Sequence, residues 1–339
     1  MDKIAFINGS TFIYWGSIIL TLAALATICV YASLYLKKGG EPMPLTASIA
    51  LSAILGMLLA RFMHWYCYAN AYSGFWSAMS NYTSGGYGLM GVFGGCLLSV
   101  LILRLLRVVD DAPMMLDCMT IAGGLGIAIG RLSALFNSAN RGVIVKNSVG
   151  FPFAAPIMNS VSGLPENRLA TFMIQSMLTG LIVLSLVVYC FVSTKRCKKV
   201  PHGDVCLLFL LTYGASQIIC DSTRYDSMFF RSNGFVSIVQ ILGLVGIVVP
   251  LVIFSIRLVQ HTKFKIWYAA IWAGILAMMG LAGYMEYYVQ RHGSEAAFAY
   301  SWMSVGLVAI IILTLLIRYL AVKAAPEHKK ETLNCENEC

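Results

Sequence analysis

Long apolar segments constrain this chain more than any other feature of its sequence. An apolar run of about 18 residues or more can cross a bilayer as a helix. Such runs recur along the chain, so we predict an all-α fold: a polytopic membrane helical bundle of about nine transmembrane helices, with no soluble module. The predicted helices are residues 10–36, 46–68, 88–109, 114–136, 170–193, 204–221, 234–258, 266–285 and 301–322.

Composition and the placement of charge agree with this class. The chain is 59% hydrophobic and only 12% charged, which is unlike a soluble domain. The net charge of +9 does not indicate a nucleic-acid partner, because the basic residues gather in alternate loops, as the positive-inside rule requires. With the N-terminus outside, the inner segments hold 15 of the 24 Lys and Arg residues: Lys37, Lys38, Arg104, Arg107, Lys195, Arg196, Lys198, Lys199, Arg257, Lys263, Lys265, Arg318, Lys323, Lys329 and Lys330.

This topology places both ends of the chain. The outer loop 69–83 has no basic residue, and residues 324–339 form a cytoplasmic tail. We expect the first apolar segment to be a retained helix and not a signal peptide, because residues 1–3 lack a positively charged leader. The ten cysteines are scattered without a CxxC pair, so we interpret them as small buried hydrophobic residues.

Four arginines depart from the positive-inside pattern. They are predicted to lie at or just inside the outer ends of the second, fourth, fifth and sixth helices: Arg61, Arg131, Arg168 and Arg224. For any one of them, the alternative is a long side chain that reaches the interface from a helix end. Four together at similar depth favour an anionic ligand, since guanidinium groups bind phosphate oxygens well. A phospholipid head group is the ligand that we expect.

The segments around these arginines resemble those of a known family, in order, across roughly residues 12–258. They are "IYWGSIIL" near Tyr14, "ARFMHWY" with Arg61, "GGYGLMGVFGG", "GRLSALFN" with Arg131 and Asn137 followed by Gly142, "YGASQIICDSTR" with Arg224, and "SIVQILGL" with Gln240. The sequence thus resembles the prolipoprotein diacylglyceryl transferases, as a divergent member.

The resemblance implies an activity and a setting. Enzymes of this family move diacylglycerol from phosphatidylglycerol to the lipobox cysteine of a prolipoprotein, in lipoprotein biosynthesis. The expected partners are therefore phosphatidylglycerol or another anionic phospholipid and a lipobox-containing prolipoprotein, in a bacterial-type plasma membrane and with no cofactor. Residues 1–260 would form the transferase-like domain of seven helices. The two additional helices within 261–323 have no role that the sequence suggests.

Several family positions carry different residues here. The histidine of the glycine-rich stretch is Met90, and the glutamate after the signature arginine is Ala139. The sixth-helix arginine and glutamate of the family correspond to Gln217 and Asp221. The cation side of the site is therefore retained in Arg131 and Arg224, while most of the family's proton-transfer residues are replaced.

The transfer chemistry needs a base, because the cysteine must react as a thiolate. His64 is the one histidine within a predicted helix, three residues after Arg61 and on the same face. We take His64 as the candidate base, against the alternative of an interfacial structural histidine. Glu166, beside Arg168 in the long outer segment 137–167, is a weaker candidate, and Tyr14 is either a lipid contact or an aromatic-belt anchor.

The sixth predicted helix carries a polar stripe. Gln217, Asp221 and Arg224 are spaced i, i+4 and i+7, so we expect them to share a face, with Asp221 and Arg224 as an ion pair. The stripe either contacts substrate or seals the helix against its neighbours. The sequence shows no metal-ligand cluster and no nucleophile–base triad.

Three functions remain open from the sequence. The favoured one is a lipid transferase with Arg131, Arg224 and His64 as catalytic residues. The alternative is a catalytically silent protein that binds anionic lipid or lipoprotein precursors. A small-anion transporter is the least favoured, because its charges should lie at mid-membrane depth, whereas these cluster at one side.

Overall fold

The computed structural model describes residues 4–8, 11–81, 85–146, 148–158, 163–195, 200–230, 233–262 and 265–324. The chain divides into two compact units, each considered by itself. The first unit comprises residues 1–190, 201–206 and 223–239, and the second comprises residues 191–200, 207–222 and 240–339. The basic residues Arg196, Lys198, Lys199 and Lys263, whose location we predicted, and residues 325–339 of the predicted tail lie outside the described residues.

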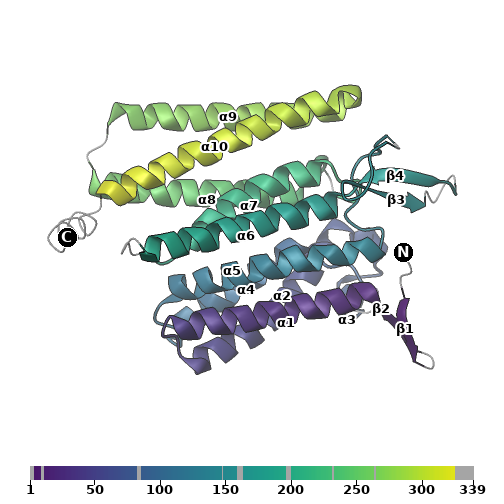
Figure 1. Ribbon diagram of the computed structural model, residues 1–339, viewed down its shortest axis with the longest axis horizontal. Coiled ribbons are helices and arrows are strands. Elements are labelled where there is room, and N and C mark those ends of the chain that lie inside the picture. Colours follow the sequence, from purple (N-terminus) through teal and green to yellow (C-terminus); the bar gives the residue numbers. More distant parts are fainter. Residues whose placement is uncertain are drawn as a thin grey trace. The chain divides into compact units, whose positions relative to one another are not determined.

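Within these described ranges, nine long helices correspond one by one to the nine predicted helices (Figure 1). They are α1 Trp15–Lys37, α2 Pro42–Cys67, α4 Leu89–Leu105, α5 Ala112–Arg131, α6 Thr171–Lys195, α7 Asp204–Ser222, α8 Ile238–His261, α9 Ile266–Arg291 and α10 Ala296–Ala324. Eight are long and apolar enough to cross a membrane, and α4 is a shorter apolar helix of 17 residues, at the lower end of the spanning range. The all-α membrane bundle is confirmed, and the chain is a multi-pass membrane protein.

Short elements fill the connections. They are the helix α3 Phe75–Ser80, the 3₁₀ turns η1 Ala69–Ala71, η2 Leu132–Phe136 and η3 Gly293–Glu295, and three antiparallel hairpins: β1 Ile4–Asn8 with β2 Thr11–Tyr14, β3 Ala154–Met158 with β4 Pro165–Leu169, and β5 Phe229–Phe230 with β6 Asn233–Ser237.

The hairpins correct two boundaries and one loop of the sequence prediction. The first helix begins at Trp15 and not at residue 10, the eighth begins at Ile238 and not at residue 234, and the segment 137–167 contains a hairpin. Hydropathy alone cannot separate a short strand from the end of an apolar helix. Residues 11–14, Thr-Phe-Ile-Tyr, are β-branched or aromatic types that favour an extended chain.

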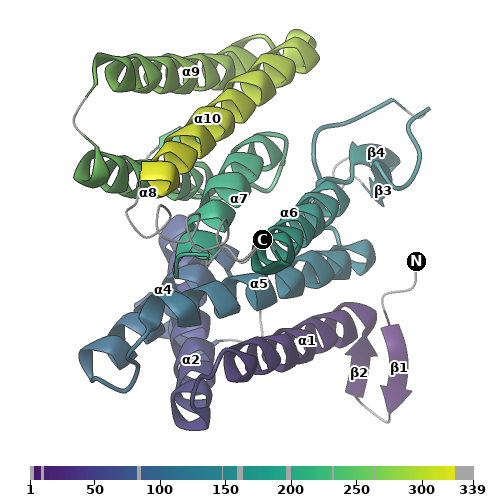
Figure 2. The same ribbon diagram turned by 60° about the vertical axis from the view of Figure 1, so that its left-hand side comes forward.

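In the first unit the helices pack as pairs through small residues. Helix α1 lies along α5 in both views of the ribbon (Figures 1 and 2), and α2 packs against α4. A Cβ atom on Gly95 would lie 2.3 Å from the backbone nitrogen of Gly56, and one on Gly91 would lie 2.4 Å from the carbonyl oxygen of Leu59. The backbones of α2 and α4 therefore approach closely because these positions have no side chain.

A buried carboxylate connects the start of α5 to the start of α7. Asp117 is 2% exposed and accepts hydrogen bonds from the backbone nitrogens of Gly203, at 2.8 Å, and Cys206, at 2.9 Å. These N–H groups at a helix N-terminus have no partner within the helix, and the positive end of the helix dipole favours an anion there. Asp117 thus has a structural contact within the first unit.

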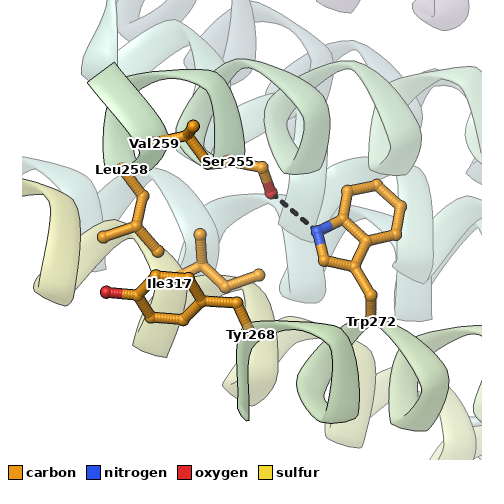
Figure 3. Close-up of a pocket in the computed structure, with 6 residues that line it drawn as sticks. All are labelled: Ser255, Leu258, Val259, Tyr268, Trp272 and Ile317. Atoms are coloured by element: carbon orange, nitrogen blue, oxygen red, sulfur yellow. Dashed lines mark hydrogen bonds between the residues drawn. The ribbon is translucent and has the colours of Figure 1, made fainter. Parts of the chain in front are cut away.

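In the second unit, glycines bring α7 and α8 together, and α9 packs along α10. Gly214 and Gly243 approach so closely that a Cβ atom on Gly214 would lie 2.6 Å from the Gly243 carbonyl oxygen. A small apolar cavity of about 50 Å³ lies between α8, α9 and α10, beside the hydrogen bond from Trp272 Nε1 to Ser255 Oγ (Figure 3). This volume accommodates about one or two water molecules, so the cavity is too small for a lipid or a peptide.

The close packing of α2 on α4 predicts opposite results for two adjacent glycines. Replacement of Gly95 by alanine forces the helices apart, and overpacking of this kind costs about 1–3 kcal/mol. Gly94→Ala is the matched control, because its Cβ atom would meet only Leu59 Cδ1 at 3.6 Å. Thermal unfolding in detergent should show a lower midpoint for Gly95→Ala and an equal or higher one for Gly94→Ala. Equal midpoints for the two variants would contradict this packing.

Candidate functional site

Polar side chains converge at one end of the first unit. The C-terminal end of α5, the N-terminal end of α6 and the hairpin β3–β4 lie together there (Figure 1). Arg131 is the last residue of α5, and its Nη1 donates to Asn140 Oδ1 at 2.9 Å. Asn140 has a φ of 56°, a backbone conformation that asparagine tolerates better than most residues. Arg131 is thus held by a neutral amide, which leaves its positive charge uncompensated by this contact.

Asp226 extends this contact into a network. Its Oδ2 accepts from the backbone nitrogen of Asn140 at 2.9 Å, and its Oδ1 accepts from Arg224 Nε at 3.0 Å. Arg131, Asn140, Asp226 and Arg224 therefore form one continuous chain of hydrogen bonds. The network joins segments that are 86 residues apart.

Arg224 corrects the predicted helical stripe. Helix α7 ends at Ser222, so Arg224 lies beyond the helix and does not share a helical face with Gln217 and Asp221. The structure pairs Arg224 with Asp226, and the predicted pairing of Arg224 with Asp221 stays a prediction. The i, i+7 spacing does not place Arg224 on the helical face because the helix ends two residues before the arginine.

Gly142 lies at the centre of this backbone arrangement. Its nitrogen donates to the Leu169 carbonyl at 2.8 Å, and the residue forms a β-bridge with Arg224. A Cβ atom at this position would lie 2.5 Å from Thr171 Oγ1 and 2.9 Å from Leu169 Cβ. A glycine is therefore required for the segment after α5 to approach both β4 and the chain after α7.

Glu166 and Arg168 pair on the same strand, β4. Glu166 Oε2 accepts from Arg168 Nη2 at 3.0 Å and from Arg168 Nε at 3.2 Å. The Arg168 guanidinium also lies over the Tyr225 ring, 4.8 Å from its centroid, and donates to the Gly142 carbonyl at 3.3 Å. The positive charge of Arg168 is therefore balanced within the protein.

Arg61 lies in a different neighbourhood of the first unit. It is 2% exposed and donates to four backbone carbonyls: those of Ala78, Asn81, Gly85 and Gly86. The Tyr72 and Tyr87 rings lie 5.0 Å and 5.5 Å from its guanidinium carbon. Arg61 thus stabilises the segment between α2 and α4 through these hydrogen bonds. Its predicted role in lipid binding stays a prediction.

His64 lies close to this same segment. Its Nδ1 is 2.9 Å from Tyr72 Oη, and its ring covers Gly86, where a Cβ atom would lie 2.6 Å from His64 Cε1. The His64 ring also lies 4.9 Å from the ring of Tyr68, whose hydroxyl donates to the Ser227 carbonyl at 3.3 Å. Ser227 follows Asp226, so a short series of contacts leads from His64 to the arginine network.

Met90 contributes to an apolar cluster near this connection. Met63, Met228 and Val239 are buried together, and Met90 and Cys67 pack against them. Met228 is two residues from Asp226. The position at which the resemblance implies a histidine is therefore occupied by a thioether in apolar surroundings, and it offers no group for proton transfer.

The remaining predicted residues have diverse locations. Tyr14 ends β2 and is 48% exposed. Asn137 caps its own turn, since its Oδ1 accepts from the Ala139 nitrogen at 2.9 Å. Gln217, Asp221 and Gln240 belong to the second unit, on α7 and α8, and all three are buried. Within the described ranges, no three His, Cys, Asp or Glu side chains group as metal ligands would.

Sequence analysis missed three members of this site. Arg141, Asn140 and Asp226 were not among the predicted site residues. Arg141 is 4% exposed, and burial lowers the pKa of its guanidinium from the usual value. A polar loop in the sequence does not reveal which of its side chains will be buried, although the four polar residues within "NSANRG" were a usable signal.

Comparison with known proteins finds a family match over most of the chain. The model of a family described as "Prolipoprotein diacylglyceryl transferase" matches residues 3–256. A "Phosphatidylglycerol--prolipoprotein diacylglyceryl transferase" of Prochlorococcus marinus (strain MIT 9303) is 24% identical over 230 residues, which cover 63% of this chain and 75% of that protein. The whole arginine network lies within the matched residues, whereas α9 and α10 lie beyond them.

The network predicts that Asp226 is needed to hold Arg224 and Asn140. Asp226→Asn keeps the shape of the side chain and removes its charge. The partly exposed ion pair and the hydrogen bond from Asn140 are weakened, with an expected loss of about 1 kcal/mol. Asp110→Asn, at an exposed loop carboxylate, is the control and should leave the thermal midpoint unchanged. An unchanged midpoint in Asp226→Asn would show that the network is not stabilising.

Proposed function

Because the chain belongs to the prolipoprotein diacylglyceryl transferase family, we propose that it binds phosphatidylglycerol and transfers the diacylglyceryl group to the lipobox cysteine of a prolipoprotein. We assign residues 1–260 to the transferase-like domain, and the family match over residues 3–256 supports this assignment. Residues 261–323 add two helices, and residues 324–339 form a tail.

The hydrogen bonding of Arg131 is the observation that carries the proposal. Its Nη1 is held by the neutral amide of Asn140, and its buried Nε has no hydrogen-bond acceptor among the described residues. A cation without a carboxylate partner in a membrane protein is costly unless an anion binds there. A phosphate group would accept from Nε and balance the charge, since hydrogen bonds between a guanidinium and a phosphate are among the strong ones.

The transfer step needs this cation again. A bond forms between the cysteine Sγ and the glyceryl carbon while the bond from that carbon to the phosphate oxygen breaks, and glycerol phosphate leaves. Negative charge grows on the departing phosphate, so a fixed cation lowers the barrier more than it favours the bound lipid. Arg131 serves this role, and Arg224, oriented by Asp226, assists it.

His64 is the proposed base that takes the thiol proton. Accepting a proton on Nε2 requires Nδ1 to carry hydrogen, which it then donates to Tyr72 Oη, the partner 2.9 Å away. Tyr72 and Gly86 fix the ring, and the contacts through Tyr68 lead toward Asp226. The charges of Glu166 and Arg168 balance each other. We assign the other predicted residues to substrate binding or to the support of the substrate site: Glu166, Arg168, Tyr14, Asn137, Gly142, Gln217, Asp221 and Gln240.

A second candidate function rests on Met90. Met90 packs beside Met228 in an apolar cluster, and its thioether cannot serve as the base that a histidine would supply at this position. A protein that keeps the cationic side of the site but lacks the base would bind phosphatidylglycerol or a lipoprotein precursor without transfer. Lipid affinity is the same under both proposals, and only the chemistry separates them.

The two candidates differ in a transfer assay. The purified protein is incubated with phosphatidylglycerol and a lipobox peptide, and mass addition at the peptide cysteine is measured. We expect transfer by the native chain and a loss of at least about 100-fold in His64→Ala with lipid affinity intact, since a general base contributes about 10²–10⁴-fold. His292→Ala, at the end of α9, is the control and should keep full activity.

Two outcomes of this assay would change the proposal. Full activity in His64→Ala would assign the base to another residue. No transfer by the native chain, together with binding of phosphatidylglycerol that Arg131→Ala abolishes, would establish the silent binding protein. Binding that Arg131→Ala leaves unchanged would remove both candidates.

We further propose that the chain lies in a bacterial-type plasma membrane with its N-terminus outside and its C-terminus cytoplasmic, as the distribution of Lys and Arg favours. Trp76, 79% exposed, would then face the outside, and the exposed Arg107 the cytoplasm. In a background without other reactive cysteines, an impermeant maleimide should label Trp76→Cys and spare Arg107→Cys in intact cells. The opposite labelling would reverse the orientation.

A further inference from the structure

Arg141 is a buried cation in the segment between η2 and β3. It is 4% exposed, and its guanidinium carbon lies 4.5 Å from the centroid of the Phe172 ring. Its Nη2 donates to the carbonyls of Ala134 and Asn137, each at 3.2 Å. Among the described residues, Arg141 makes no ion pair. A buried charge without a counter-charge is expensive, and proteins avoid it unless a ligand or a partner group compensates.

The other two nitrogens of the Arg141 guanidinium group lack acceptors among the described residues. Nε and Nη1 are buried there and make no hydrogen bond. Arg131 Nε is in the same situation. Within the part of the chain that the structure describes, every buried side-chain nitrogen without a partner belongs to one of these two arginines. Native proteins leave few buried donors unsatisfied, so two such arginines in one place call for a ligand.

The two guanidinium groups are attached to the same short segment. Arg131 binds the side chain of Asn140, the residue before Arg141. Arg141 in turn binds the carbonyls of Ala134 and Asn137, within six residues after Arg131. The chain therefore folds back on itself between residues 131 and 141 and brings both cations to the end of α5.

Arg61 shows what a satisfied buried arginine looks like in this protein. It is as buried as Arg141, at 2% exposed, yet its nitrogens donate to four backbone carbonyls. These hydrogen bonds give Arg61 a structural role. Arg141 has two carbonyl acceptors on a single nitrogen, and that contact does not explain why a full guanidinium occupies the site.

We propose that Arg141, with Arg131, forms a phosphate-binding subsite in which the oxygens of one phosphate group accept from the unpaired donors of both arginines. The subsite rests on the proposed function, and it names a holder of the lipid phosphate that the predicted residues did not include. A phosphate has several oxygens, each able to accept more than one hydrogen bond, so it can serve two guanidinium groups at once. It also supplies the negative charge that the surrounding protein does not.

If this subsite exists, replacement of Arg141 should preserve or raise the stability of the protein and lower its affinity for phosphatidylglycerol. Arg141→Met removes an uncompensated buried cation, keeps a long side chain against Phe172, and should therefore raise or preserve the thermal midpoint in phosphatidylcholine nanodiscs. The same change should weaken binding of phosphatidylglycerol by about 10- to 100-fold, the range expected when hydrogen bonds to a charged group are lost. Arg61→Met is the matched control, and its midpoint should fall because four carbonyls lose their donors.

The experiment compares the native chain, Arg141→Met and Arg61→Met in nanodiscs of phosphatidylcholine, with and without phosphatidylglycerol. A rise in the native midpoint on adding phosphatidylglycerol, absent in Arg141→Met, is the expected result. A further arm adds inorganic phosphate to phosphatidylcholine nanodiscs at matched ionic strength. An equal, Arg141-dependent rise in that arm would identify free phosphate as the ligand and retain the subsite while removing the lipid.

Contrary results are distinct for the two proposals. A native chain that shows no preference for phosphatidylglycerol, and no response to phosphate, contradicts both. A native preference that Arg141→Met retains contradicts the subsite alone. A fall in the midpoint of Arg141→Met like that of Arg61→Met, or failure of Arg141→Met to fold, assigns Arg141 a structural role. Arg141→Lys, which keeps the charge, should still lose affinity at least about tenfold, because an ammonium cannot reproduce the planar set of donors.

Discussion

A guanidinium group that leaves water must find an acceptor for its N–H groups and a partner for its charge, and this requirement shapes one end of the first unit. Two of the arginines there meet this requirement with a carboxylate, and a third does not. Arg168 has the carboxylate of Glu166, Arg224 has that of Asp226, and Arg131 has only the neutral amide of Asn140. The charge that remains uncompensated is therefore concentrated on Arg131 and its neighbour Arg141.

The backbone around these cations is organised by the same contacts. Asp226 accepts from the Asn140 nitrogen as well as from Arg224, so one carboxylate connects the chain after α5 with the chain after α7. Gly142 permits this because any side chain there would collide with Thr171 and Leu169. The site is thus built from irregular segments that rigid helices position, an arrangement that membrane proteins tolerate where backbone groups are buried in protein.

Hydropathy predicted the helices well and the site only in part. Each of the nine apolar runs became a helix, because a span of lipid demands a fixed length of apolar chain. The hairpins at residues 4–14 and 154–169 were not predicted, since a few strand residues give little signal beside a long helix. Arg131 was recognised by its unusual place at the end of an apolar run. Arg141 and Asp226 were not, because their importance comes from burial and from contacts between segments 86 residues apart, which no local pattern contains.

The central claim is that uncompensated arginine charge at the end of α5 holds an anionic phospholipid. Native mass spectrometry, applied to protein equilibrated with equal amounts of phosphatidylglycerol and phosphatidylcholine, tests it most directly. The account predicts that the native chain retains phosphatidylglycerol in preference, and that the double variant Arg131→Gln, Arg141→Met, shown to be folded by its thermal midpoint, retains both lipids equally. Equal retention of the two lipids by the native chain, or an undiminished preference in the double variant, would contradict the account.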